Sequence, residues 1–138
     1  METPPNTLFN REVPPFVAHL GIEVIRAEQA QSELALDLQP WQLNDLGMGH
    51  GGVVMTLLDV TMAVAARAGD PERRGVVTIE MKTSFLRPAK GRLRCLGFCD
   101  HRSKSMAFCR AELRDAHGRL LAQAMGSFKR LSPGMGSD

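Results

Sequence analysis

Asp59 is the residue that a purely structural role explains worst. It lies between Leu58 and Val60, in a segment from Gly51 to Ala68 that is otherwise mostly apolar. A buried carboxylate without a partner costs several kcal/mol or becomes protonated. We interpret Asp59 as a functional carboxylate beside a pocket, because mostly small side chains share its flank of the expected helix. A structural ion pair is the alternative.

A glycine pair precedes Asp59 by two helical turns, since 59 − 51 = 8. Gly51 and Gly52 leave backbone N–H groups unobstructed where the helix is expected to begin. Such groups have no partner inside the helix, and the helix dipole favours negative charge there. This arrangement is typical of an oxyanion site in acyl transfer, although a glycine turn that allows close helix packing explains it equally well.

Two polar residues of the preceding loop are further candidates. His50 could act as a general base, or it could bond to loop backbone. Asn44 could cap or brace the loop, or it could orient a water or a thioester. Neither residue alone indicates a function.

Basic residues stand at two expected strand ends. The candidates for gripping phosphate groups are Arg87, Pro88 and Lys90 at one turn and Arg102, Ser103 and Lys104 at another. A solvated turn is the simpler interpretation for any one of them.

The elements that must position these residues follow from the apolar pattern. A short helix is expected before Gly21, then a strand hairpin over residues 22–38 that turns near residues 29–31. The long helix, Gly51 to Ala68, comes next, followed by four strands. These strands are expected at 76–86, 91–99, 105–115 and 120–129. A single helix must be wrapped by a curved sheet, so the predicted class is α+β with an antiparallel sheet around one central helix.

Length and composition limit the alternatives. The 138 residues suit one domain, predicted over 9–130, with flexible tails at 1–8 and 131–138. A net charge of +2 does not favour nucleic acid as the main partner. The three cysteines are expected to be reduced thiols on strands, with no disulfide framework and no zinc site. The N-terminus does not look like a signal peptide, and the apolar run is too short to span a membrane, so we expect a cytoplasmic protein.

The spacing of these residues resembles a known family. Asn44, then His50-Gly51-Gly52, then Leu58-Asp59 resembles the phenylacetate-pathway (PaaI-like) type of acyl-CoA thioesterase, which has the hot-dog fold. The resemblance extends over residues 9–130 and is most specific from His50 to Asp59. It implies hydrolysis of an acyl-CoA thioester to a free acid and CoA.

The resemblance also implies roles. Asp59 would be the nucleophile or the general base, and the amide of Gly51 or Gly52 would polarise the carbonyl. Asn44 and His50 would position the carbonyl and the loop, while Thr78 would assist the attacking water from a partner subunit. The six basic-turn residues named above would bind CoA. The family works as homodimers or homotetramers with sites at the subunit interface, and CoA is part of the substrate, with no metal or other cofactor.

Two other functions compete with hydrolysis. Acyl-thioester hydratases and dehydratases of this fold usually pair an Asp with a His about five residues away, whereas His50 and Asp59 are 59 − 50 = 9 residues apart. A non-catalytic acyl-CoA-binding protein is the other alternative. The sequence does not identify the acyl group.

Overall fold

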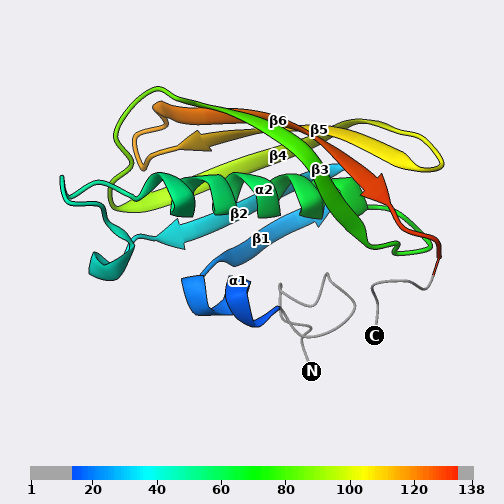
Figure 1. Cartoon of the computed structure of the whole chain (residues 1–138), viewed down its shortest axis with the longest axis horizontal. Helices are drawn as coiled ribbons and strands as arrows, with labels where there is room; N and C mark the ends of the chain where they lie inside the picture. The colour runs from blue at the N-terminus through cyan, green and yellow to red at the C-terminus, as the bar shows by residue number, and fades with distance from the viewer. Residues whose placement is uncertain (1–13, 134–138) are drawn as a thin grey trace.

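The computed structural model describes residues 14–133, which form three helical segments and six strands (Figure 1). In chain order these are α1 (Pro15–Leu20), β1 (Glu23–Glu28), β2 (Gln31–Asp37), the short 3₁₀ helix η2 (Pro40–Gln42), α2 (Gly51–Arg67), β3 (Val76–Phe85), β4 (Arg92–Arg102), β5 (Met106–Arg114) and β6 (Leu120–Arg130). The predicted flexible tail at 1–8 lies outside the described residues, as do residues 9–13 and 134–138.

The six strands form one antiparallel sheet in the order β1-β2-β4-β5-β6-β3. Figure 1 shows α2 lying across one face of this sheet, with β1 and β2 on one side of the helix and β3 and β6 on the other. Because α2 contacts all six strands, the sheet must curve around it. This arrangement confirms the predicted hot-dog architecture and leaves β1 and β3 as the sheet edges.

The helix α2 is largely buried because apolar side chains occur on several of its sides. Leu57, Leu58 and Met62 are fully covered in the core between helix and sheet. Helix and sheet approach closely at Gly97 of β4, where a Cβ atom would come within 2.7 Å of the Thr61 carbonyl oxygen. The Ser32 hydroxyl donates a hydrogen bond of 2.7 Å to the same carbonyl. This close packing fixes α2, and with it the candidate site, relative to the sheet.

The predicted element boundaries agree closely with the structure except in β4. The first hairpin turns at Gln29 and Ala30, which both have positive φ angles (48° and 64°). By contrast, β4 was predicted to end at Cys99 but continues to Arg102. A bulge between Cys99 and His101 lets pairing with β5 resume, so the expected turn at 100–104 is shorter than predicted.

No helix within residues 14–133 is long and apolar enough to cross a membrane.

Candidate active site

The beginning of α2 presents one backbone donor that the helix does not use. His50 is the N-cap residue, and its Nδ1 atom accepts a hydrogen bond of 2.9 Å from the N–H of Gly52. The His50 carbonyl accepts from the N–H groups of Val53 and Val54. Among residues 14–133, no group accepts a hydrogen bond from the N–H of Gly51. Of the two predicted oxyanion donors, the Gly51 amide is therefore the available one, and His50 serves as a helix cap.

Asn44 braces the loop that leads into α2. Its Oδ1 atom accepts hydrogen bonds from the N–H groups of Leu46 (2.9 Å) and Met48 (3.1 Å). The N–H of Gly49 donates to the Ala89 carbonyl at 2.8 Å, which ties this loop to the segment after β3. The side-chain oxygen of Asn44 therefore braces the loop, which is one of the roles left open for this residue.

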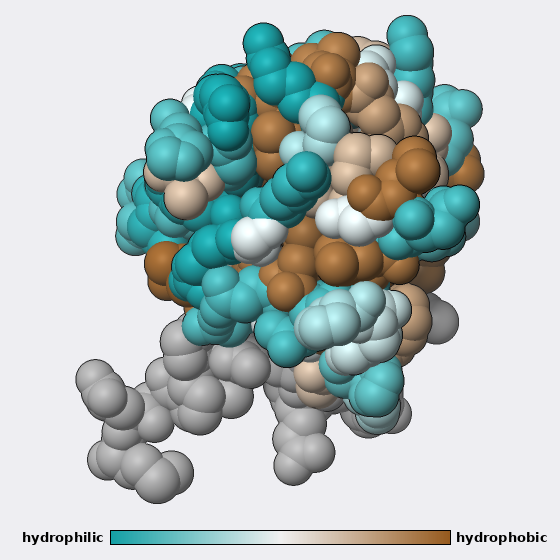
Figure 2. Space-filling model, turned by 90° about the vertical axis from the view of Figure 1, so that its left-hand side faces the viewer, coloured by the Kyte–Doolittle hydropathy of each residue, from teal (hydrophilic) through white to brown (hydrophobic). Residues whose placement is uncertain are grey.

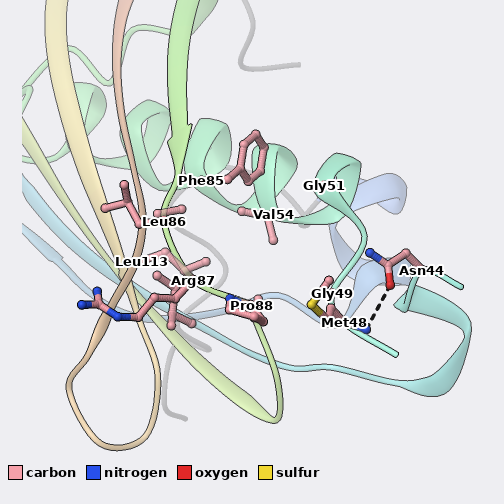
Figure 3. Close-up of a pocket in the computed structure, with 13 residues that line it drawn as sticks. Asn44, Met48, Gly49, Gly51, Val54, Phe85, Leu86, Arg87, Pro88 and Leu113 are labelled. Atoms are coloured by element: carbon pink, nitrogen blue, oxygen red, sulfur yellow. Dashed lines mark hydrogen bonds between the residues drawn. The ribbon is translucent and has the colours of Figure 1, made fainter. Parts of the chain in front are cut away.

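A cavity of about 330 Å³ lies beside Gly51. It is bounded by the first turn of α2, the loop with Asn44 and Met48, and the end of β3 (Figure 3). Its apolar walls come from elements that are far apart in the sequence. They are formed by Met48, Val54, Phe85, Leu86, Pro88, Ala89, Leu113, Leu121 and Ala122. Figure 2 views this end of the molecule, where brown apolar side chains gather within a teal polar surround.

The carboxylate of Asp59 has a partner on the neighbouring edge strand. The Thr78 hydroxyl of β3 donates a hydrogen bond of 2.7 Å to Asp59 Oδ1. Asp59 is partly exposed and Thr78 is exposed, so this pair lies at the surface of the chain. Asp59 is therefore neither fully buried nor without a partner, because β3 runs alongside α2 and supplies a hydroxyl. The contact also lies within one chain, whereas the resemblance placed Thr78 in the site from a partner.

Asp59 and the Gly51 amide are too far apart to act on one carbonyl within a single chain. Eight residues of α-helix correspond to an axial rise of about 12 Å. A reacting carbonyl carbon must lie about 3 Å from its attacking group, and its oxygen about 3 Å from the oxyanion donor. The spacing of two helical turns between Gly51 and Asp59 therefore does not bring the two groups together.

The first basic turn borders the cavity. Pro88 and Arg87 are both lining residues. The guanidinium of Arg87 points away from Gly51 (Figure 3) and donates to the Leu120 carbonyl at 2.7 Å, while the side chain remains exposed. Lys90 is exposed on the same turn.

The second basic turn lies at the opposite end of α2. Nη1 of Arg102 donates to the carbonyls of Ala66 (3.0 Å), in the last turn of the helix, and of the C-cap residue Ala68 (3.1 Å), which also accepts from the N–H of Ala30. Ser103 Oγ accepts from the N–H of Met106, and only Lys104 is fully exposed. This placement argues against the predicted phosphate role of Arg102, because its guanidinium already caps a helix. The two predicted CoA-binding turns do not form one surface within a single chain.

The apolar wall of the cavity was missed by sequence reasoning. Phe85 ends β3 and lies about 3.8 Å from where a Gly51 Cβ would be. Leu113 and Leu121 come from β5 and β6. Nothing in their local sequence distinguishes them from ordinary core residues, because the cavity exists only once three strands and α2 meet.

Comparison with known proteins agrees with this fold. A family model described as "Thioesterase superfamily" matches residues 46–122. The medium/long-chain acyl-CoA thioesterase YigI of Salmonella typhimurium is 25% identical over 130 residues, covering 83% of this chain and 84% of that protein. A mutant of the phenylacetic acid degradation protein PaaI from Thermus thermophilus superposes with a TM-score of 0.77 at 25% identity, covering 86% of this chain and 100% of that one. Escherichia coli PaaI superposes with a TM-score of 0.81, covering 87% of this chain and 86% of that one, and its 20% identity supports the fold alone.

Proposed function

Because the chain belongs to the thioesterase superfamily, we propose that it hydrolyses an acyl-CoA thioester to a free carboxylic acid and CoA. Family membership supports an enzyme of the hydrolase class. The free Gly51 N–H at the helix start, beside an apolar cavity, supports the more specific proposal. A thioester carbonyl needs such a donor, and an acyl chain needs such a cavity.

The Gly51 amide would hold the thioester carbonyl oxygen, which becomes negative in the tetrahedral intermediate. The acyl chain would then enter the cavity lined by Val54, Phe85 and Leu113. The cavity walls carry few polar groups, and this favours an uncharged acyl chain over a dicarboxylic one. His50 supports the amide indirectly, because its cap on Gly52 holds the first turn of α2 in place.

The Asp59 carboxylate would start the reaction. It either attacks the carbonyl carbon or removes a proton from a water that does so. The Thr78 hydroxyl fixes one carboxylate oxygen, which leaves the other oxygen available for the reaction. When the C–S bond breaks, the sulfur of CoA leaves as a thiolate that takes up a proton, and water supplies the new oxygen of the acid.

A second copy of the chain would complete each site. The axial separation of about 12 Å prevents Asp59 and the Gly51 amide of one helix from meeting at one carbonyl. Apolar side chains are exposed near Asp59 on α2 and on the edge strand β3, including Met55 (36% exposed) and Ile79 (56%). An antiparallel pairing of two copies across this strip would place Asp59 of one beside Gly51 of the other, and would cover the strip.

The CoA nucleotide would lie at the first basic turn. Arg87 and Lys90 are exposed beside the cavity and can offer positive charge to phosphate groups. Lys104 could contribute positive charge to CoA binding only from a different part of the surface.

The test of the proposal removes one hydrogen-bond donor from the site. Gly51→Pro deletes the amide donor at the first helical position, where proline is well tolerated, and His50 already has the extended conformation that a following proline requires (φ −59°, ψ 137°). We expect kcat for acyl-CoA hydrolysis to fall by roughly 10²–10³-fold. Gly51→Ala keeps the N–H, and its Cβ meets only ordinary contacts at 3.8 Å, so it is the matched control. Equal activity of the two variants would contradict the role of the amide.

A further inference from the structure

Two cysteines face each other across neighbouring strands, at the end of the sheet that packs on the second half of α2. Cys99 of β4 and Cys109 of β5 are directly opposite in the antiparallel register. The N–H of Cys99 donates a hydrogen bond of 2.8 Å to the carbonyl of Ala30, which lies on the side of β4 away from β5. Since both polar groups of a strand residue point to the same side, Cys99 and Cys109 form a non-hydrogen-bonded pair. Such pairs have Cα atoms about 4.5 Å apart, within the range that a disulfide requires.

The two thiols differ in exposure and in acidity. Cys99 is partly exposed, whereas Cys109 is 4% exposed within the core. A hydrogen bond from the Cys109 thiol lowers the pKa of Cys99 to about 7 despite its partial burial, and the positive charge of Arg102 adds to this effect. The same hydrogen bond, together with burial, raises the pKa of Cys109. An accessible, acidic thiol beside a protonated one is the arrangement of an attacking and a resolving cysteine.

We propose that Cys99 and Cys109 are a redox site, which a hydroperoxide converts to an intrachain disulfide between β4 and β5. The Cys99 thiolate attacks one oxygen of hydrogen peroxide, so that an S–O bond forms, the O–O bond breaks and the leaving hydroxide becomes water. The sulfur of Cys109 then attacks the sulfenic acid of Cys99. The S–S bond forms, the S–O bond breaks, and the proton of Cys109 leaves with the hydroxide as a second water. Peroxide gains the two electrons that the two sulfurs lose.

This site is independent of the thioesterase proposal. It uses neither the Gly51 amide nor the Asp59 carboxylate, and it refines the expectation of three reduced thiols on strands. The third cysteine provides a control within the same strand. Cys95 is fully buried, and burial raises its pKa to about 12. The residue opposite it on β5 is Leu113, which has no thiol.

The experiment treats the full chain with hydrogen peroxide near pH 7.5, then denatures it and alkylates free thiols before intact-mass measurement. The reduced protein should take up three alkyl groups. The oxidised protein should take up one, should weigh two hydrogen atoms less before alkylation, and should recover all three after treatment with a dithiol. Cys95→Ser should still lose two reactive thiols on oxidation. Cys99→Ser, which alters a partly exposed position, should lose the mass change altogether.

Three results would overturn the proposal. They are three alkyl groups on the peroxide-treated protein, a disulfide that persists in Cys99→Ser, and a disulfide-linked dimer on a non-reducing gel in place of the intrachain bond.

Discussion

The Thr78 hydroxyl donates a hydrogen bond of 2.7 Å to the Asp59 carboxylate across 19 residues of sequence. It joins the edge strand β3 to the middle of α2. A hydroxyl in this position orients the carboxylate without neutralising it. The bond also selects which carboxylate oxygen stays free, so we assign Thr78 as a positioning residue in the proposed reaction.

Thr78→Val tests this assignment, because it keeps the shape of the side chain and removes only the hydroxyl. A hydrogen bond to a charged group contributes about 1.5–3 kcal/mol, so we expect kcat to fall by roughly 10- to 100-fold. The measurement is steady-state kinetics with the melting temperature recorded alongside. Thr78→Ser restores the hydroxyl and should recover most of kcat. A Val variant with a lowered melting temperature and normal kcat would give Thr78 a structural role instead.

Subunit complementation tests whether each site draws on two copies. Asp59→Asn and Gly51→Pro should each be nearly inactive alone. If the two are refolded or expressed together, hybrid dimers should contain one site with both functional groups. Random pairing in a two-fold dimer predicts recovery of about one quarter of the wild-type rate. An absence of recovery, with hybrids demonstrated by differently tagged copies, would place the whole site within one chain.

Arg87 and Arg102 should behave differently when replaced by alanine. Arg87→Ala should raise KM for acyl-CoA and leave kcat nearly unchanged, which is the pattern of lost uniform binding. Short thioesters that lack the nucleotide should be unaffected. Arg102→Ala should instead lower the melting temperature by several degrees, because the Ala66 carbonyl loses its donor and the Ala68 carbonyl keeps only the N–H of Ala30. A raised KM in a stable Arg102→Ala variant would restore its predicted CoA role.

The environment of the Asp70 carboxylate lets us predict how the stability of the folded protein depends on pH. Its side chain is 3% exposed and accepts hydrogen bonds from the N–H groups of Glu72 and Arg74 and from the Arg130 guanidinium. Burial alone would raise the pKa of Asp70, but these donors outweigh it and hold the pKa below its usual value. A carboxylate with a depressed folded pKa stabilises the protein fully above its unfolded pKa of about 3.9, and this contribution is lost as pH falls through the folded value.

Asp70→Asn should therefore unfold at a lower temperature than the wild type at pH 7, and the difference should shrink as the pH falls below about 4. Thermal melts of both proteins across pH 2–7 make the measurement, and the comparison cancels the other carboxylates. A difference that stays constant across this range would assign the loss to packing rather than to the charge.

The sequence predicts the fold well because the fold depends on local signals. The apolar run from Gly51, the alternation in β2 and the turn residues between strands each specify their element without reference to the rest of the chain. The boundary of β4 was missed because a bulge after Cys99 restores a pairing that the alternation pattern alone does not indicate.

The candidate site was predictable only where it is contiguous in the sequence. Asn44, His50 and Gly51 lie on one loop and helix start, and their proximity follows from their spacing. The contact of Thr78 with Asp59, the cavity wall at Phe85 and the capping of α2 by Arg102 all depend on how distant elements pack. An isolated arginine near a strand end looks the same in sequence whether it binds phosphate or caps a helix.

The kinetics of Asp59→Asn test the central claim most directly. The amide keeps the shape of the side chain and can still accept the hydrogen bond from Thr78, so the melting temperature should stay close to that of the wild type. The variant should bind acyl-CoA, while kcat should fall by roughly 10²–10⁴-fold, the usual cost of losing a positioned acid–base group. A folded Asp59→Asn variant with near wild-type kcat would contradict the proposed mechanism.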